Sequence, residues 1–121
     1  MKIDYLHEGS DDCPLVRLYQ FQSAEIQRLR GSFESLVSGM TDRIVLGDVE
    51  SVDGTHLTFT RGASDQGVMQ TGPHSFDVVL TSDGWQDCIA LLEPFCQPAY
   101  GHHWLCDVGR IRLLVSSDGS W

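Results

Sequence analysis

The sequence predicts a single α+β domain with a mainly antiparallel sheet and two helices on one face. Segments in which apolar residues alternate are separated by segments in which they recur every three or four positions, which are the patterns of strands and helices. Each of the two helical segments carries one apolar stripe, which is buried when the helix packs on one face of a sheet. The chain has 121 residues, a length typical of one domain spanning residues 1–121.

The clearest unit lies between residues 76 and 95. Residues 76–81 alternate as a strand, and the helix after them has a stripe formed by Trp85, Cys88, Ile89 and Leu92. Asp83 is expected to cap this helix, and Gln86 three residues later completes a capping box. Pro94 is expected to end it.

The first half of the chain contains a similar arrangement. Residues 15–21 form a strand pattern, Ser23 is expected to cap the helix that follows, and Gly39 is expected to stop it. Its apolar face is formed by Ile26, Leu29, Phe33, Leu36, Val37 and Met40. Residues 3–7 could add a short strand, and the segment between them, with Asp11 and Asp12, is expected to be a solvated turn.

Two hairpins are expected, each turning through three residues that end in a left-handed glycine. In the first, Arg43–Ser51 pairs with Thr55–Arg61 around Val52-Asp53-Gly54, which sets Val49 opposite Leu57 and Gly47 opposite Phe59. In the second, residues 102–106 pair with 110–116 around Asp107-Val108-Gly109. That register sets Leu105 opposite Ile111 and Trp104 opposite Arg112, where a cation–π contact would form.

The order of elements suggests that a βαββ unit is used twice. The two units span residues 14–61 and 76–116, and an irregular loop at 62–75 joins them. Within that loop, Val68-Met69 could form a brief strand. One sheet of six or seven strands under both helices is the preferred arrangement, and two small packed sheets are the alternative.

The net charge of the chain limits the classes of partner that it is expected to bind. Its net charge of −9 repels phosphate backbones, so nucleic acid is disfavoured and a basic partner is favoured. No apolar run approaches the roughly 18 residues that span a bilayer, and residues 1–5 contain no apolar signal region. A cytoplasmic location without membrane binding is therefore expected.

No metal, cofactor or catalytic residue is expected. The cysteines Cys13, Cys88, Cys96 and Cys106 form no C-x-x-C pair and are interpreted as small buried hydrophobes. His102 and His103 are adjacent in a strand and point to opposite faces, so they should not grip one metal. The chain has no nucleophile elbow, zinc-protease helix or phosphate loop.

The candidate ligand-binding residues lie in the long loop and the second hairpin. Long loops are unusual unless they are functional or mobile, which directs attention to the polar groups of residues 62–75 and their neighbours. The candidates are Arg61, Asp65, Gln66, His74, His102 and Trp104.

Several short motifs resemble those of short bacterial proteins of the planctomycete type. They are Asp65-Gln66-Gly67, Thr71-Gly72-Pro73, Glu93-Pro94-Phe95 and the closing segment from Leu113 to Trp121. The resemblance covers most of the chain, implies a bacterial, cytosolic setting and carries no assigned activity.

A non-enzymatic module is therefore the leading functional hypothesis. It would bind a protein partner, in particular a basic one, or assemble with itself as a homodimer. The alternative is a small enzyme or ligand-binding protein with a pocket between loop 62–75 and hairpin 102–116.

Overall fold

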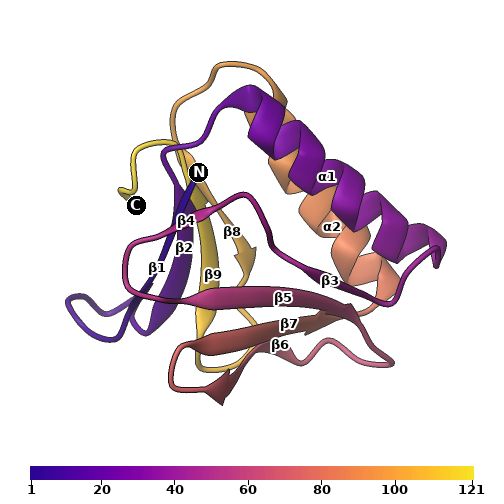
Figure 1. Ribbon diagram of the computed structural model, residues 1–121, viewed down its shortest axis with the longest axis horizontal. Helices are drawn as coiled ribbons and strands as arrows, with labels where there is room; N and C mark the ends of the chain where they lie inside the picture. Colours follow the sequence, from indigo (N-terminus) through magenta and orange to yellow (C-terminus); the bar gives the residue numbers. More distant parts are fainter.

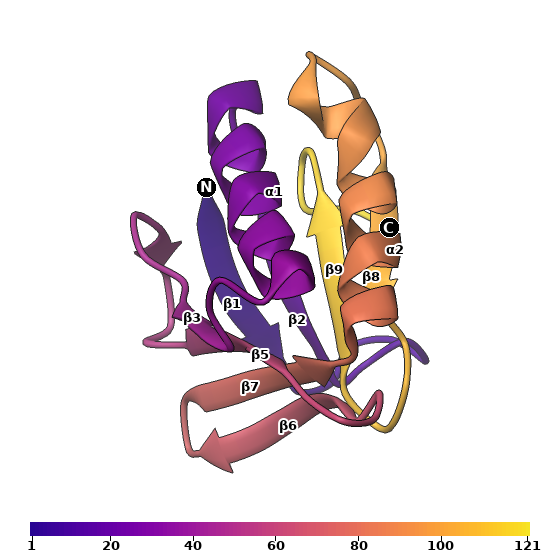
Figure 2. The same ribbon diagram turned by 90° about the vertical axis from the view of Figure 1, so that its right-hand side faces the viewer.

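The computed structural model describes all of residues 1–121 and confirms the α+β class. Helices α1 (Ser23–Ser38) and α2 (Ser82–Leu92) lie side by side, and a 3₁₀ turn, η1 (Glu93–Cys96), extends the second (Figures 1 and 2). The strands form two mixed sheets, the arrangement that the sequence left as the alternative to one sheet. None of the helices is long and apolar enough to cross a lipid bilayer.

The five-stranded sheet has the order β4-β1-β2-β9-β8. Its strands are β1 (Lys2–Leu6), β2 (Leu15–Tyr19), β4 (Glu50–Ser51), β8 (His102–Cys106) and β9 (Arg112–Ser116). The antiparallel pairs β1–β2 and β8–β9 are joined at the centre by a parallel pair. In that pair Leu15 lies opposite Arg112 and Tyr19 opposite Ser116, so the two ends of the chain build one sheet.

The four-stranded sheet has the order β3-β5-β7-β6. Its strands are β3 (Arg43–Val45), β5 (His56–Arg61), β6 (Gly67–Gly72) and β7 (Ser75–Leu80). Here too a central parallel pair, β5–β7, joins two antiparallel ones. This sheet lies across one end of the helix pair and of the five-stranded sheet (Figure 1).

The two halves of the chain have matching topology. Residues 2–61 run β1-β2-α1-β3/β4-β5, and residues 67–116 run β6-β7-α2-β8-β9, so each half is a ββαββ unit. In each half the two strands before the helix pair in one sheet and the strands after it lie in the other, except that β4 pairs with β1. The expected loop at 62–75 contains the full strand β6, which the glycines at both its ends concealed because glycine is depleted in strands.

An aromatic cluster fills the space between the helices and the four-stranded sheet. Phe33 on α1, Phe59 on β5 and Trp85 on α2 have ring centroids 4.8 to 5.5 Å apart. The indole N–H of Trp85 donates to the carbonyl oxygen of Thr60 at 3.0 Å, which satisfies its one polar group inside the core. The expected role of Trp85 and Cys88 as core residues agrees with their burial.

Both helices begin one or two residues earlier than the sequence suggested. The α1 N-cap is Gln22, whose backbone N–H donates to Glu25 Oε1 at 2.8 Å. The α2 N-cap is Thr81, whose hydroxyl accepts from the N–H of Gly84 at 3.2 Å, so the Asp83 capping box is wrong. Asp83 instead lies in the first turn, where its charge favours the helix dipole. Gly39 ends α1 in the left-handed conformation, as expected.

The first hairpin is interrupted. Only Arg43–Val45 pairs with β5, with Ile44 opposite Phe59, so the expected pairs Val49–Leu57 and Gly47–Phe59 are wrong. Residues 46–49, here named the crossing segment, leave the four-stranded sheet, and β4 then pairs with β1 in the other sheet. Asp48 sits in the left-handed region at φ 53°, which turns the chain between the sheets.

The second hairpin has a bulge between Trp104 and Cys106. Trp104 therefore lies opposite Leu114, and the expected Leu105–Ile111 and Trp104–Arg112 pairs are wrong. The expected cation–π contact still forms, with the Arg112 guanidinium 5.6 Å from the centre of the Trp104 ring, because the side chains are diagonal neighbours. The three-residue turns are equivalent, since Gly54 and Gly109 both have φ 83°.

Hydrogen bonds and ion pairs between polar side chains lie along the outer face of the five-stranded sheet. Arg17 donates to both carboxylate oxygens of Asp4, at 2.8 and 2.9 Å, and to the carbonyl of Gly119 at 2.7 Å. The indole of Trp121 donates to Asp12, which also pairs with Arg112. The C-terminal residues are thereby held against the sheet.

Candidate functional site

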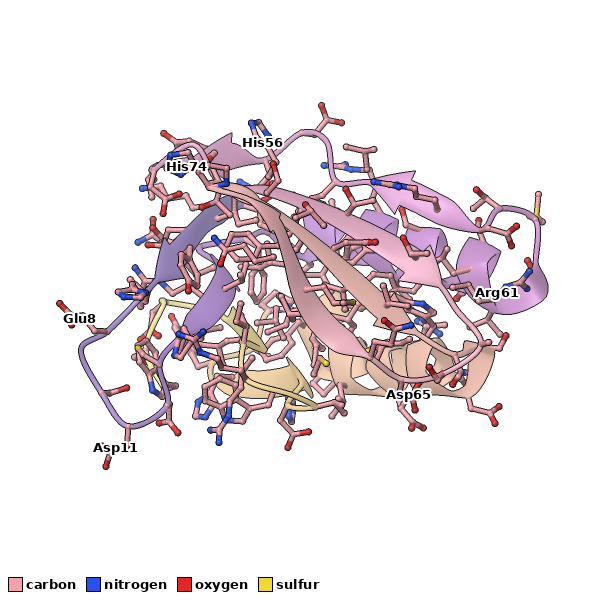
Figure 3. All side chains as sticks on the ribbon, turned by 90° about the horizontal axis from the view of Figure 1, so that it is seen from below. Glu8, Asp11, His56, Arg61, Asp65 and His74 are labelled. Atoms are coloured by element: carbon pink, nitrogen blue, oxygen red, sulfur yellow. The ribbon has the colours of Figure 1, made fainter.

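Two of the six sequence-predicted residues have structural partners at one end of the four-stranded sheet (Figure 3). Arg61 forms an ion pair with Asp42 at 2.6 Å. Asp65 accepts from the backbone N–H and the hydroxyl of Thr81, at 2.8 and 2.9 Å. The Asp65 carboxylate therefore fixes the residue that caps α2.

Of the other four predicted residues, Gln66 lies beside Asp65 and the remaining three lie elsewhere. His74 is at the opposite end of the sheet, beside His56, whose N–H donates to the His74 carbonyl at 2.7 Å (Figure 3). Gln66 uses its backbone N–H to bond Val79, and its side chain is exposed. His102 and Trp104 lie on β8 in the other sheet, with ring centroids 6.3 Å apart.

Loop 62–75 and hairpin 102–116 touch through their backbones. Val68 forms an isolated bridge with Ile111, and Gly67 lies against the carbonyl of Val108 so closely that no side chain would fit. The six predicted residues are therefore spread over both sheets rather than gathered around one point.

The cysteines are free thiols of two kinds. Cys88 and Cys106 are buried, while Cys13 and Cys96 are half-buried. Burial, with smaller effects of nearby Cys106, Asp87 and Asp65, raises the pKa of Cys88 to about 12. Burial is also the main cause that raises the pKa of Cys106. Neither thiol is therefore activated as a nucleophile. No three His, Cys, Asp or Glu side chains are placed to hold a metal ion.

Carboxylates gather at the end of the molecule where α2 begins. Asp65 Oδ1 lies against Gly84 in the first turn of α2, and Asp87 lies one turn further along that helix. Asp107 follows the end of β8, where the Cys88 thiol of α2 bonds Leu105. Asp83 adds a fourth carboxylate from the first turn of α2. This group of Asp65, Asp83, Asp87 and Asp107, here named the acidic end, has exposed side chains and forms no ion pair within the chain.

Internal pairing leaves most of the acidic charge free. Six of the 17 acidic side chains form ion pairs, which leaves eleven without one. Four of the eight basic side chains are paired as well, and the unpaired ones are Lys2, Arg28, Arg43 and Arg110. The negative field is therefore available to a partner.

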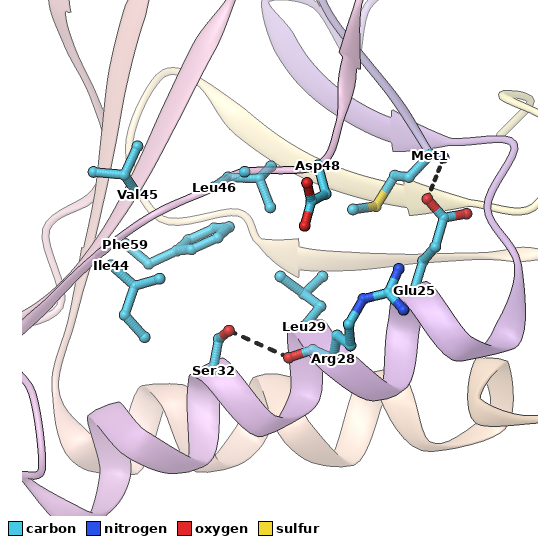
Figure 4. A pocket seen from close by; sticks show the side chains of 11 residues that line it. Met1, Glu25, Arg28, Leu29, Ser32, Ile44, Val45, Leu46, Asp48 and Phe59 are labelled. Atoms are coloured by element: carbon cyan, nitrogen blue, oxygen red, sulfur yellow. Dashed lines mark hydrogen bonds and ion pairs between the residues drawn. The ribbon is translucent and has the colours of Figure 1, made fainter.

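A cavity of about 200 Å³ lies between α1 and the crossing segment (Figure 4). Its walls are mainly apolar, and its mouth carries the charged side chains of Glu25, Arg28 and Asp48. The apolar lining residues are Met1, Leu29, Ile44, Val45, Leu46 and Phe59. We name it the α1 cavity.

The α1 cavity exists because the first hairpin is interrupted. The backbone N–H of Leu46 bonds Leu57 and that of Glu50 bonds Met1, but the amides between them have no backbone partner. In the second half of the chain, the matching strand β8 stays in one sheet despite its bulge and packs directly on α2, where the Cys88 thiol bonds the Leu105 carbonyl.

A second cavity, of about 450 Å³, opens near the start of α1. It lies between the α1 N-terminus and the segment after η1, and its aromatic lining residues are Phe21, Phe95 and Tyr100. Tyr100 is almost fully exposed, and the cavity contains no charged residue.

Comparison with known proteins gives no relative: no family model, no curated protein and no solved structure matches the chain. Function is therefore inferred from the fold and the surface of the chain itself.

Sequence reasoning missed the α1 cavity. Its signal was Gly47-Asp48 in the middle of an expected strand, because both residues are depleted in strands and a glycine inside one often marks a break. The other half of the site comes from α1, 20 residues earlier, and only the tertiary fold brings the two together.

Proposed function

We propose that the protein is a non-enzymatic binding module that recognises a basic protein partner through the acidic end. The observation that supports this most is the set of four carboxylates around the start of α2, none of which is neutralised by an ion pair within the chain. The absence of an activated thiol at this end is consistent with binding rather than covalent chemistry.

Three of the four carboxylates of the acidic end are held by a helix or by hydrogen bonds. Asp65 is fixed by its two hydrogen bonds to Thr81, and Asp83 and Asp87 lie on α2, whose apolar side is anchored by the buried Trp85. A preorganised charged surface loses little conformational freedom when a partner docks. Complementary charge accelerates association and selects the partner, and its effect weakens as salt screens it.

The test compares two triple variants of equal charge. Asp83→Asn, Asp87→Asn and Asp107→Asn neutralise the acidic end and leave Asp65, which caps α2, in place. Glu8→Gln, Asp11→Asn and Glu50→Gln remove the same charge from exposed positions elsewhere. Both variants and the wild type are used to capture proteins from a lysate of the source organism at about 50 and 500 mM salt, which differ about three-fold in screening length. Captured proteins are purified and their affinities measured by calorimetry.

The expected partner is basic, dissociates at the higher salt concentration, and binds the acidic-end variant at least about ten-fold more weakly while retaining the control. Equal weakening by both variants would contradict recognition at this surface. Light scattering of the purified protein provides the second readout. A salt-independent homodimer without a basic partner would replace the proposal with self-assembly.

A further inference from the structure

The α1 cavity has the properties of a small-molecule site. Leu29 and Phe59 are buried at its base, and Ile44 on β3 and Leu46 on the crossing segment complete an apolar wall (Figure 4). Its volume of about 200 Å³ exceeds the roughly 150 Å³ of an apolar cavity that accepts benzene. An aliphatic or aromatic group the size of a leucine or phenylalanine side chain therefore fits.

The mouth of the α1 cavity offers two opposite charges. The third charged group, Glu25, is already engaged by the N-terminal ammonium at 2.6 Å and by the Gln22 N–H at 2.8 Å. Arg28 and Asp48 form no ion pair with each other or with any other residue. The Arg28 guanidinium lies on the side of Glu25 in Figure 4, without an ion pair to it. This guanidinium and the unpaired Asp48 carboxylate thus flank the same apolar space from facing elements, α1 and the crossing segment.

Asp48 adopts a backbone conformation that few non-glycine residues have. It is one of two non-glycine residues with positive φ, and its amide and that of Gly47 have no backbone partner. Non-glycine residues in this region often occur at binding sites, where the surrounding structure maintains the conformation. In Figure 4 the Asp48 carboxylate points into the cavity, towards Leu29.

We propose that the α1 cavity binds a free apolar α-amino acid. The side chain of the amino acid fills the space between Leu29 and Phe59, its carboxylate pairs with Arg28, and its ammonium group pairs with Asp48. This activity lies beyond partner recognition at the acidic end, because it uses other residues and requires no protein partner.

Other ligand classes satisfy fewer of these groups. A phosphate or a fatty acid would pair with Arg28 but would leave Asp48 facing a negative charge. A metal ion would find one free carboxylate and a guanidinium, and metal sites need several oxygen or nitrogen ligands. A neutral hydrocarbon would leave both charges unused. A zwitterion with an apolar body is the class that engages the walls and both charged groups.

The experiment uses calorimetry together with amide NMR spectra of the full chain. The probes are L-leucine and L-phenylalanine. Three controls each lack one feature: glycine has no apolar side chain, 4-methylpentanoate has no amine, and 3-methylbutylamine has no carboxylate. We expect saturable shifts in amides of α1 and the crossing segment with the first two probes. Each control is expected to bind at least about ten-fold more weakly, since burial of a leucine-sized side chain and a charged hydrogen bond are each worth that much in affinity.

Variants assign each contact. Arg28→Gln should bind leucine no better than 3-methylbutylamine, and Asp48→Asn, which keeps the left-handed preference, should bind it no better than 4-methylpentanoate. Ser32→Leu, on the cavity wall, should block all probes. Arg43→Gln and Glu50→Gln lose the same charges outside the cavity lining and should bind as the wild type does.

The proposal is overturned if neither amino acid gives a saturable shift at about 10 mM, a concentration that nearly fills any site with a Kd of about 1 mM or below. It is also overturned if the one-charge controls bind as well as leucine, or if the shifted amides lie outside α1 and residues 44–48. Because the probes act on the unmodified protein, a variant that fails to fold does not affect the main result.

Discussion

Cys88 Sγ lies 3.3 Å from the carbonyl oxygen of Leu105, and its thiol donates a hydrogen bond that ties α2 to β8. Both residues are buried, so the bond is shielded from water. The Cys88 thiol thus packs in the core and makes one hydrogen bond, and its low reactivity follows from that environment.

Thiol labelling should separate the four cysteines into two classes. At pH 8 iodoacetamide should modify Cys13 and Cys96 within minutes and leave Cys88 and Cys106 unmodified, because burial raises the pKa of both and restricts access. Mass spectrometry of peptides gives the extent at each site. Full labelling in about 6 M guanidinium serves as the control. Rapid modification of Cys88 in the folded protein would contradict its buried position.

The protein should lose stability in alkali. Burial raises the pKa of Cys88 from 9.0 to about 12, so above pH 9 the unfolded chain releases a proton that the folded chain keeps. The unfolded state then binds fewer protons, and the free energy of unfolding falls as pH rises from about 9 to 12, by about 1.4 kcal/mol per unit for this group. The raised pKa values of Cys106 and Tyr19, both mainly due to burial, act in the same direction.

Urea titrations at pH 8 and pH 10 measure this loss. Cys88→Ala should be less stable at pH 8, by about 1–2 kcal/mol for the lost packing and hydrogen bond, but should lose less between the two pH values. Equal pH dependence in the variant and the wild type would assign the loss to other groups.

The Arg17–Asp4 ion pair should contribute strongly to the stability of the fold, because the Asp4 carboxylate is buried. Asp4 is 7% exposed, and Arg17→Met would leave it without its two hydrogen bonds at 2.8 and 2.9 Å. We expect a loss of about 3 kcal/mol, the usual effect of removing one partner of a buried pair. The double variant Arg17→Met/Asp4→Leu should recover much of that loss in chemical denaturation. If the single variant unfolds like the wild type, water must reach Asp4 freely.

A pair of glycine variants should reveal the close approach between the two sheets. Gly67 has φ 81° and lies against the Val108 carbonyl, while Gly54 has φ 83° and open space around it. Gly54→Ala should cost about 1 kcal/mol for the backbone alone, and Gly67→Ala should cost clearly more because the backbone must also move. Thermal melting of both variants measures the difference, and equal losses would argue against the contact.

Local patterns predicted the helices and the turns, although Met40, assigned to the apolar face of the first helix, lies beyond the end of α1 and is exposed. The stripe from Ile26 to Leu36 lies on the buried face of α1, and Gly54 and Gly109 adopt the conformations expected for their turns. These features depend on residues that are close in sequence, where periodicity and glycine chemistry act directly.

The sequence patterns did not predict which distant strands pair or in which register. The hairpin registers were wrong because β4 pairs with β1 in the other sheet and because a bulge shifts β8. Gly47-Asp48 signals the first break but does not say which strand β4 joins. The α1 cavity needs Arg28 and Asp48 to meet across the fold. The predicted residues Arg61 and Asp65 instead form contacts within the fold: Arg61 pairs with Asp42, and the Asp65 carboxylate bonds the backbone of Thr81.

The parallel pairing of β2 with β9 has a consequence for synthesis of the protein. At about 5–20 residues per second, roughly 5 to 20 seconds pass between the emergence of Tyr19 and that of its partner Ser116. During that time β2 has one unpaired edge, and neither sheet can close at its centre from the first half alone. Closure across such a large loop makes folding slow, because the entropy of joining distant segments is lost before their contacts form. Protection of the nascent chain by a chaperone would therefore matter most in the interval before β9 arrives.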